Sequence, residues 1–151
     1  MINKNITKMN NLKTTPLNRL KHCYGVANFM YQVSKTYYHW SEEKAREMYI
    51  LGMLHDQGYE FDNGLHHEQV IIDILGKDYK YRNEILHHGE YTAEYQSQEL
   101  ELLWLADMVV DGEGNLVGFE GRLKDIKNRH GNKDNAYLES CKLVEYLSKK
   151  F

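Results

Sequence analysis

The 151-residue sequence contains one proline, Pro16, and two cysteines, Cys23 and Cys141. No helix after Pro16 is therefore interrupted by proline. The cysteines form no CxxC pair, which argues against a thiolate zinc site and favours free thiols in a reducing compartment. No apolar stretch approaches the roughly 20 residues that cross a bilayer, and the polar start lacks the apolar core of a signal peptide. We therefore expect a cytoplasmic protein with no membrane partner.

The sequence also lacks an excess of basic residues. It has 19 Lys and Arg against 22 Asp and Glu, a formal net charge of -3. Proteins that bind nucleic-acid polymers usually present a basic face, so we expect no such partner. A small phosphorylated ligand held by a few local cations is compatible with this balance. The length fits one domain, and we expect a flexible arm over 1–14 followed by a single domain over 15–151.

Apolar residues recur at helical spacing along most of the chain, and no segment alternates as a strand does. Thr15 and Pro16 form a helix-start signal, and Ser41 and Ser97 are expected N-caps. Gly131 is an expected helix stop. The fold class predicted is all-α, a compact bundle of six to seven helices. The expected helices cover 17–38, 42–56, 65–75, 78–88, 98–109, 119–130 and 134–149.

Histidine is concentrated in one part of the sequence. Five of the eight histidines lie between positions 55 and 88, namely His55, His66, His67, His87 and His88. Histidine is the most common metal ligand in proteins and titrates near neutral pH. This concentration indicates a local chemical role.

Four residues on three predicted helices could meet in the core as a metal site: His22, His55, Asp56 and Asp107. Asp107 is flanked by apolar residues, and a buried carboxylate is costly unless it is paired or bound to a cation. Ligands from separate helices commonly build such sites in bundles. Imidazoles and carboxylates without a thiolate suit manganese, iron, magnesium, nickel or zinc. The sequence does not choose among these divalent metals.

The order His … His-Asp … Asp resembles the HD-domain metal-dependent phosphohydrolase superfamily, in particular its small single-domain bacterial members. Residues 19–26 resemble the first-helix motif of that family, 53–59 its signature turn and 105–107 its last ligand. Residues 121–131 are similar to the tail of small members. The resemblance implies an HD-domain fold with His22, His55, Asp56 and Asp107 as ligands of a first ion.

Many members of that superfamily hold a second ion through two further histidines, with the first aspartate bridging. The candidates are His66 or His67 and His87 or His88. We expect one member of each doublet to face the site, and we favour His66 and His87. Many members also carry a lysine soon after the His-Asp pair. This chain has Tyr59 and Glu60 there, which argues against a mechanism that uses the lysine and against the cyclic-dinucleotide branch.

The predicted function is metal-dependent hydrolysis of a small phosphorylated substrate, a nucleotide or dinucleotide polyphosphate by resemblance. A divalent ion makes water more acidic and neutralises phosphate charge. Asp56 and His55 are the expected catalytic residues. Arg19, which shares a helix face with His22, is the leading phosphate-binding candidate. Tyr59 and Arg122 are further substrate-binding candidates.

Two other functions remain open from the sequence. One is a non-catalytic module that binds metal and nucleotide. The other is a di-iron oxygenase-type enzyme, which requires all six ligands and iron. The oligomeric state, including a homodimer, is also open.

Overall fold

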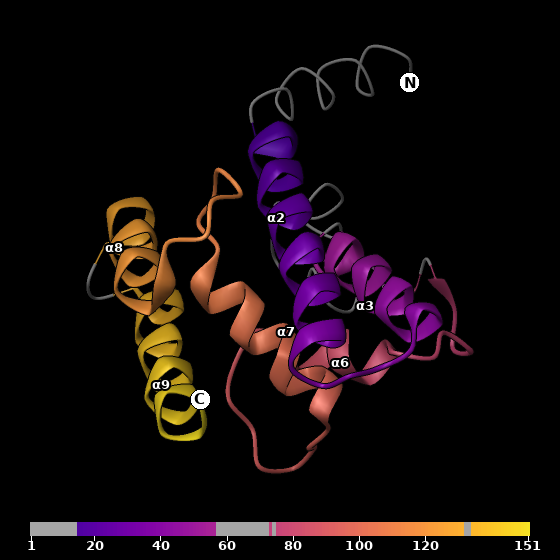
Figure 1. Cartoon of the computed structure of the whole chain (residues 1–151). Coiled ribbons are helices and arrows are strands. Elements are labelled where there is room, and N and C mark those ends of the chain that lie inside the picture. The colour runs from indigo at the N-terminus through magenta and orange to yellow at the C-terminus, as the bar shows by residue number, and fades with distance from the viewer. Residues whose placement is uncertain (1–14, 57–72, 74, 132–133) are drawn as a thin grey trace.

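The computed structural model describes residues 15–56, 73, 75–131 and 134–151. Six α-helices lie in this part of the chain (Figure 1): α2 (Thr15–Thr36), α3 (Glu42–Leu54), α6 (Arg82–His87), α7 (Gln98–Val109), α8 (Gly118–His130) and α9 (Asn135–Lys150). The described residues form no strand, only one isolated antiparallel bridge between Val110 and Leu116. The predicted all-α class is confirmed. The predicted arm over 1–14 and most of the predicted helix over 65–75 lie outside the described residues.

Helix α7 forms the centre of the fold. It contacts each of the other five helices and lies between α2 and α3 on one side and α8 and α9 on the other (Figure 1). Every residue from Leu100 to Ala106 is buried, as expected for a helix surrounded by protein. Trp104 is fully buried and donates its indole N–H to the carbonyl of His87, 3.2 Å away. Asp107 is therefore carried into the interior by its own helix.

Helices α2 and α3 pack closely because Gly52 has no side chain. A Cβ at Gly52 would lie 2.7 Å from Cα of Ala27, closer than real Cβ contacts. Glycine inside a helix is unfavourable by roughly 1 kcal/mol relative to alanine, so its position here is explained by this contact. The close approach brings the end of α3, with His55 at its C-cap, next to α2.

The helix boundaries follow local capping chemistry. Ser41 accepts a hydrogen bond from the Lys44 amide, and Ser97 accepts one from the Leu100 amide, as predicted. Gly131 ends α8 with a φ of 87°. The helix predicted over 78–88 is shorter than expected, because residues 77–81 form turns and α6 begins only at Arg82.

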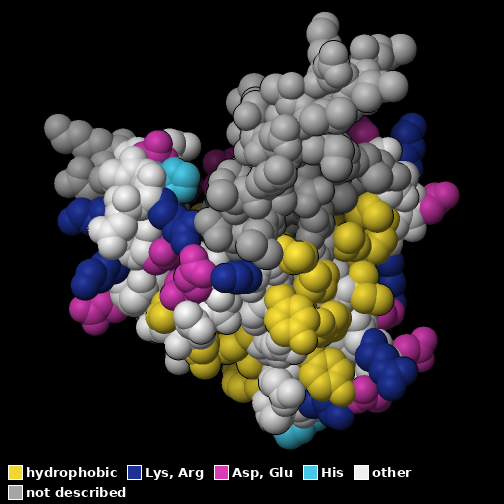
Figure 2. All heavy atoms as spheres, turned by 90° about the horizontal axis from the view of Figure 1, so that it is seen from above, with side chains coloured by type: hydrophobic (Ala, Val, Ile, Leu, Met, Phe, Trp, Pro, Cys, Tyr) yellow, Lys and Arg dark blue, Asp and Glu magenta, His cyan; other side chains and the backbone are white. Residues whose placement is uncertain are grey.

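The surface is mixed in character. Figure 2 shows a hydrophobic area on the face seen from above, bordered by charged side chains of both signs. Among the described residues, no helix combines the length and the apolar character that a membrane span requires.

Candidate metal centre

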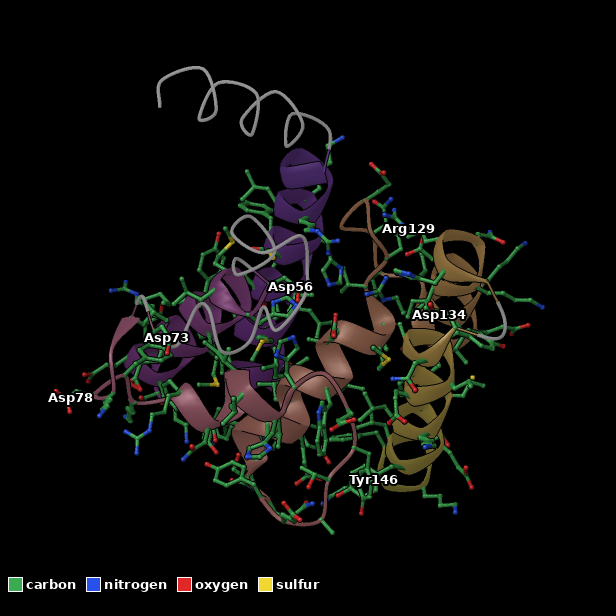
Figure 3. The ribbon with its side chains drawn as sticks, turned by 180° about the vertical axis from the view of Figure 1, so that it is seen from behind. Asp56, Asp73, Asp78, Arg129, Asp134 and Tyr146 are labelled. Carbon is green, nitrogen blue, oxygen red and sulfur yellow. The ribbon has the colours of Figure 1, made fainter. Side chains whose placement is uncertain are left out.

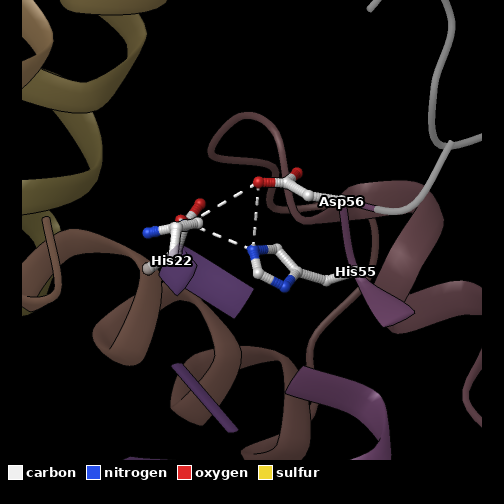
Figure 4. A group of neighbouring side chains, drawn as sticks. His22, His55 and Asp56 are labelled. Atoms are coloured by element: carbon white, nitrogen blue, oxygen red, sulfur yellow. Dashed lines mark hydrogen bonds and ion pairs between the residues drawn. The ribbon is translucent and has the colours of Figure 1, made fainter. Parts of the chain in front are cut away.

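The structure brings together the four residues of the predicted cluster. Ligand-type atoms of His22, His55, Asp56 and Asp107 all lie within 4.8 Å of one another. His22 comes from the middle of α2, the pair His55-Asp56 follows α3, and Asp107 comes from α7. Figure 4 shows His22, His55 and Asp56 directed toward one another. Residues far apart in the sequence therefore converge on one point in the core.

The nitrogen and oxygen atoms of the cluster are separated by short, similar distances. Nε2 of His22 is 2.8 Å from Oδ1 of Asp107 and 3.7 Å from Oδ2 of Asp56. Nε2 of His55 is 3.3 Å from Oδ2 of Asp56 and 3.6 Å from Oδ1 of Asp107. Ligands about 2.1 Å from one ion are separated by roughly 3.0 Å in octahedral and 3.4 Å in tetrahedral geometry. The cluster therefore has dimensions that a single divalent ion could satisfy.

Three imidazoles are oriented by backbone carbonyls. Nδ1 of His22 lies 3.0 Å from the carbonyl oxygen of Asp111, and Nδ1 of His55 lies 2.6 Å from that of Gly52. Nδ1 of His88 lies 2.5 Å from the carbonyl oxygen of Ile85. A carbonyl only accepts, so each Nδ1 carries the proton and donates it. Metal-binding histidines are commonly oriented in this way.

This tautomer leaves Nε2 of each neutral ring as an acceptor, directed at carboxylate oxygens that are also acceptors. The conflict is clearest at His55, which is fully buried and whose Nε2 forms no hydrogen bond of acceptable geometry within the part of the chain that the structure describes. Acceptors in such contact are stable only with a cation between them. That cation is either a proton on the ring or a metal ion.

The ionisation of the cluster without an ion follows the same logic. Burial is the largest single effect on His55 and opposes its charged form, but the negative charge of Asp56 and the other neighbouring groups together outweigh it and raise the pKa of His55 well above its usual value. Burial is also the largest single effect on Asp107 and opposes its ionisation, yet His22 and His55 together hold the pKa of Asp107 well below its usual range. The cluster therefore favours a positive charge beside its carboxylates.

His88 is the member of the doublet that contacts the cluster, whereas we favoured His87; the role of either ring as a metal ligand stays a prediction. Nε2 of His88 lies 3.3 Å from Oδ1 of Asp56, and its side chain is 2% exposed. His87 is only half-buried, and its ring stacks on Tyr95 with centroids 5.4 Å apart. The reason is helical phase: His88 follows the buried Ile85 by three residues and so shares its inward face.

Asp56 divides its two oxygens between different partners. Oδ2 faces His22 and His55, whereas Oδ1 faces His88. A carboxylate placed in this way can contact two centres at once. Its side chain is 12% exposed, in contrast to the fully buried ring of His55, so it is one of the more accessible groups of the cluster.

Arg122 contacts protein groups in the structure, and its predicted role in substrate binding stays a prediction. Its Nε donates to the carbonyl oxygen of Asp107 at 2.8 Å, and its Nη1 donates to Oδ2 of Asp125 at 2.9 Å. Nη2 lies 3.4 Å from Oδ1 of Asp107. Only 11% of the Arg122 side chain is exposed, and it contacts the cluster through Asp107.

The remaining predicted residues have mixed outcomes. Arg19 lies on α2 three residues before His22 and is half-buried, and its role in phosphate binding stays a prediction. Tyr59, His66 and His67 lie outside the described residues, so the structure does not place them.

Comparison with protein-family models, with curated proteins and with solved structures finds no significant match for this chain. The resemblance to the HD-domain superfamily therefore rests on the sequence motifs, and the geometry of the cluster is argued from its own chemistry.

Proposed function

We propose that this protein is a metal-dependent phosphohydrolase whose ion is held by His22, His55, Asp56 and Asp107. The observation that carries the proposal is the buried Nε2 of His55, which lies between two carboxylates and has no hydrogen-bond partner among the described residues. The order of the four residues in the sequence, which resembles that of HD-domain phosphohydrolases, supplies the reaction class. The substrate class that follows is a small phosphorylated molecule such as a nucleotide or a dinucleotide polyphosphate.

The donor set fits a divalent ion of intermediate or hard character. Two imidazole nitrogens and two carboxylate oxygens suit manganese, iron, magnesium, nickel or zinc. When bound, such an ion would supply the acidity that makes water a nucleophile near neutral pH and would neutralise charge on phosphate oxygens. The two carboxylates offset the charge of one dication, so the occupied site would carry no net negative charge that repels an anionic substrate.

The residues of the chain have separate tasks in this scheme. His22, His55 and Asp107 would hold the ion and are themselves fixed by backbone or side-chain partners. Asp56 would complete the ligand set. Its Oδ1, paired with His88, is placed to orient a water or to accept its proton. His88 would also complete a second ion position if one forms beside Asp56.

The first experiment measures the metal content of the purified protein. We expect elemental analysis of protein purified without chelator to find about one or two divalent ions per chain, and Asp56→Ala to lose them. Asp134→Asn is a matched control, because Asp134 caps α9 and takes no part in the cluster. A wild-type protein that neither retains nor binds a divalent ion would contradict the proposal.

A turnover assay distinguishes the proposed phosphohydrolase from the non-catalytic binding module and from the di-iron oxygenase-type enzyme. We expect release of phosphate or a nucleotide product from a nucleotide panel in the presence of manganese, and loss of release in Asp56→Ala. Saturable metal and nucleotide binding with no turnover would favour the non-catalytic module. Two irons per chain and consumption of oxygen would favour the oxygenase-type enzyme.

A further inference from the structure

The end of α7 depends on a residue from α8. In a longer helix the amide of Asp111 would donate to the carbonyl of Asp107, but that amide donates to Asn115 at 2.9 Å instead. Arg122 fills the vacant acceptor through Nε, at 2.8 Å. Its Nη2 approaches Oδ1 of the same aspartate at 3.4 Å. One guanidinium therefore contacts both the backbone and the carboxylate of Asp107.

Asp125 links this guanidinium to the loop that follows α7. Its Oδ2 accepts from Nη1 of Arg122 at 2.9 Å and from the amide of Gly112 at 3.0 Å. Its Oδ1 accepts from Nε of Arg129 at 3.0 Å. Figure 3 shows Arg129 between α8 and this loop. Asp125 thus receives three donors and ties α8 to the backbone at 112.

The loop that follows α7 also orients His22, the proposed ligand on α2. The carbonyl of Asp111 accepts from Nδ1 of His22 at 3.0 Å, and the carboxylate of Asp111 accepts from the amides of Glu113 and Asn115. Gly114 lies against α2, where a Cβ would be 2.4 Å from the carbonyl oxygen of Lys21. The loop is therefore held on both sides, by α8 and by α2.

We propose that Arg122 and Asp125 are positioning residues that set the geometry of the metal centre from outside it. Arg122 fixes the carboxylate of Asp107, and Asp125 fixes the loop whose carbonyl orients His22. One ion pair on α8 thereby fixes the orientation of two proposed ligands from different helices, Asp107 and His22. This inference rests on the proposed function, since it assigns a role in forming the same site.

Arginine suits this role better than lysine. Its planar guanidinium presents several donors in fixed directions, so one side chain can contact a carbonyl and two carboxylates together. A lysine would keep the charge but would not reproduce this set of contacts. Partners of metal ligands commonly change metal affinity by about 10- to 100-fold when they are removed.

The test compares variants by cobalt binding, which reports both affinity and geometry. We would measure the dissociation constant of Co²⁺ by calorimetry and its visible absorption spectrum in wild type, Arg122→Gln, Arg122→Lys and Asp125→Asn. Arg46→Gln is the matched control, because Arg46 is 73% exposed and, among the described residues, forms an i,i+4 pair with Glu42 at the surface. Thermal unfolding in chelator reports the stability of each metal-free variant.

We expect Arg122→Gln to bind cobalt about 10- to 100-fold more weakly than wild type and to shift its spectrum. Arg122→Lys should recover part of the affinity, and Asp125→Asn should weaken binding in the same direction by less. Arg46→Gln should stay within about twofold of wild type. If Arg122→Gln does not fold, Arg122→Lys and Asp125→Asn carry the test by the same criteria.

The two possible failures are distinguishable. Wild-type protein that binds no cobalt would overturn the proposed function and this inference with it. Tight wild-type binding, with unchanged affinity or an unchanged spectrum in the variants at Arg122 and Asp125, would overturn this inference alone. A loss of affinity that only follows a loss of metal-free stability, without a spectral shift, would do the same.

Discussion

Nε2 of His22 and Oδ1 of Asp107 lie 2.8 Å apart although 85 residues separate them in the sequence. The contact joins α2 to α7. His22 is fixed on its other side by the carbonyl of Asp111, and Asp107 by Arg122. Each of the two side chains is therefore also oriented by a contact outside the pair, which is the arrangement expected of a preformed binding site.

The first prediction concerns Asp107 itself. Asp107→Asn keeps the shape of the side chain but removes the charge that balances an ion, so we expect metal affinity to fall by at least about 100-fold. Titration calorimetry with Mn²⁺ measures the change, and Asp134→Asn serves again as the conservative control. A dissociation constant within a few fold of wild type would show that Asp107 is not a ligand.

The second prediction concerns pH and metal binding. The raised pKa of His55 means that this ring holds a proton in the metal-free protein near neutral pH, and an ion must displace it. Affinity should therefore fall as pH decreases, by about tenfold per unit for each proton displaced. Calorimetry in buffers of different ionisation enthalpy counts the protons released. Binding that is independent of pH and releases no proton would contradict this.

The raised pKa of His55 also predicts that the stabilities of the metal-free and the metal-bound protein change with pH in opposite directions. Because the pKa of His55 is raised by folding, its contribution to metal-free stability is present below its unfolded pKa and lost as pH rises through its folded pKa. The metal-bound form should become more stable over that range, since the ion then binds without competition. We expect thermal midpoints to fall with pH in chelator and to rise with pH in excess Mn²⁺. The contribution of Asp107, whose pKa is lowered, is lost only in acid.

The sequence was sufficient to predict the all-α class and several helix ends because their signals are local. The four cluster residues were predicted from the setting of Asp107 and from an order that resembles that of HD-domain phosphohydrolases. Caps at Ser41 and Ser97 are set by side chains next to the helix start. The apolar surroundings of Asp107 mark it as a buried carboxylate that needs a partner. Helix periodicity also distinguishes His88 from His87, since Ile85 and His88 share one face.

The supporting contacts could not be predicted in the same way. The role of Arg122 depends on where α8 lies relative to the end of α7, and no local pattern near residue 122 specifies that. The carbonyl of Asp111 orients His22 across 89 residues, and backbone groups carry no signature in the sequence. Contacts of this kind follow from the packed structure.

A fourth prediction concerns the fit of the loop against α2. Gly114 has a φ of +85°, and a Cβ there would lie 2.4 Å from the carbonyl oxygen of Lys21. Gly114→Ala should therefore combine left-handed strain with overpacking and lower the free energy of unfolding by about 2 to 4 kcal/mol. Gly118→Ala is the control, because Gly118 has a φ of +77° but no atom of the described residues lies within 4 Å of its Cβ position. Urea denaturation that gives equal losses for both would show that the close approach is unimportant.

The last prediction separates the two histidines at the end of α6. His88→Gln removes a ring that contacts Oδ1 of Asp56, so we expect the rate of phosphate release at saturating Mn²⁺ to fall by at least about tenfold. His87→Gln removes only the stacking on Tyr95, worth about 1 kcal/mol of stability, and should leave the rate within about twofold. The two substitutions are adjacent and chemically identical, so any general effect of disturbing α6 appears in both. If His87→Gln were the more damaging to turnover, the inward position of His88 would have no functional meaning, and the ring beside Asp56 would be a packing residue.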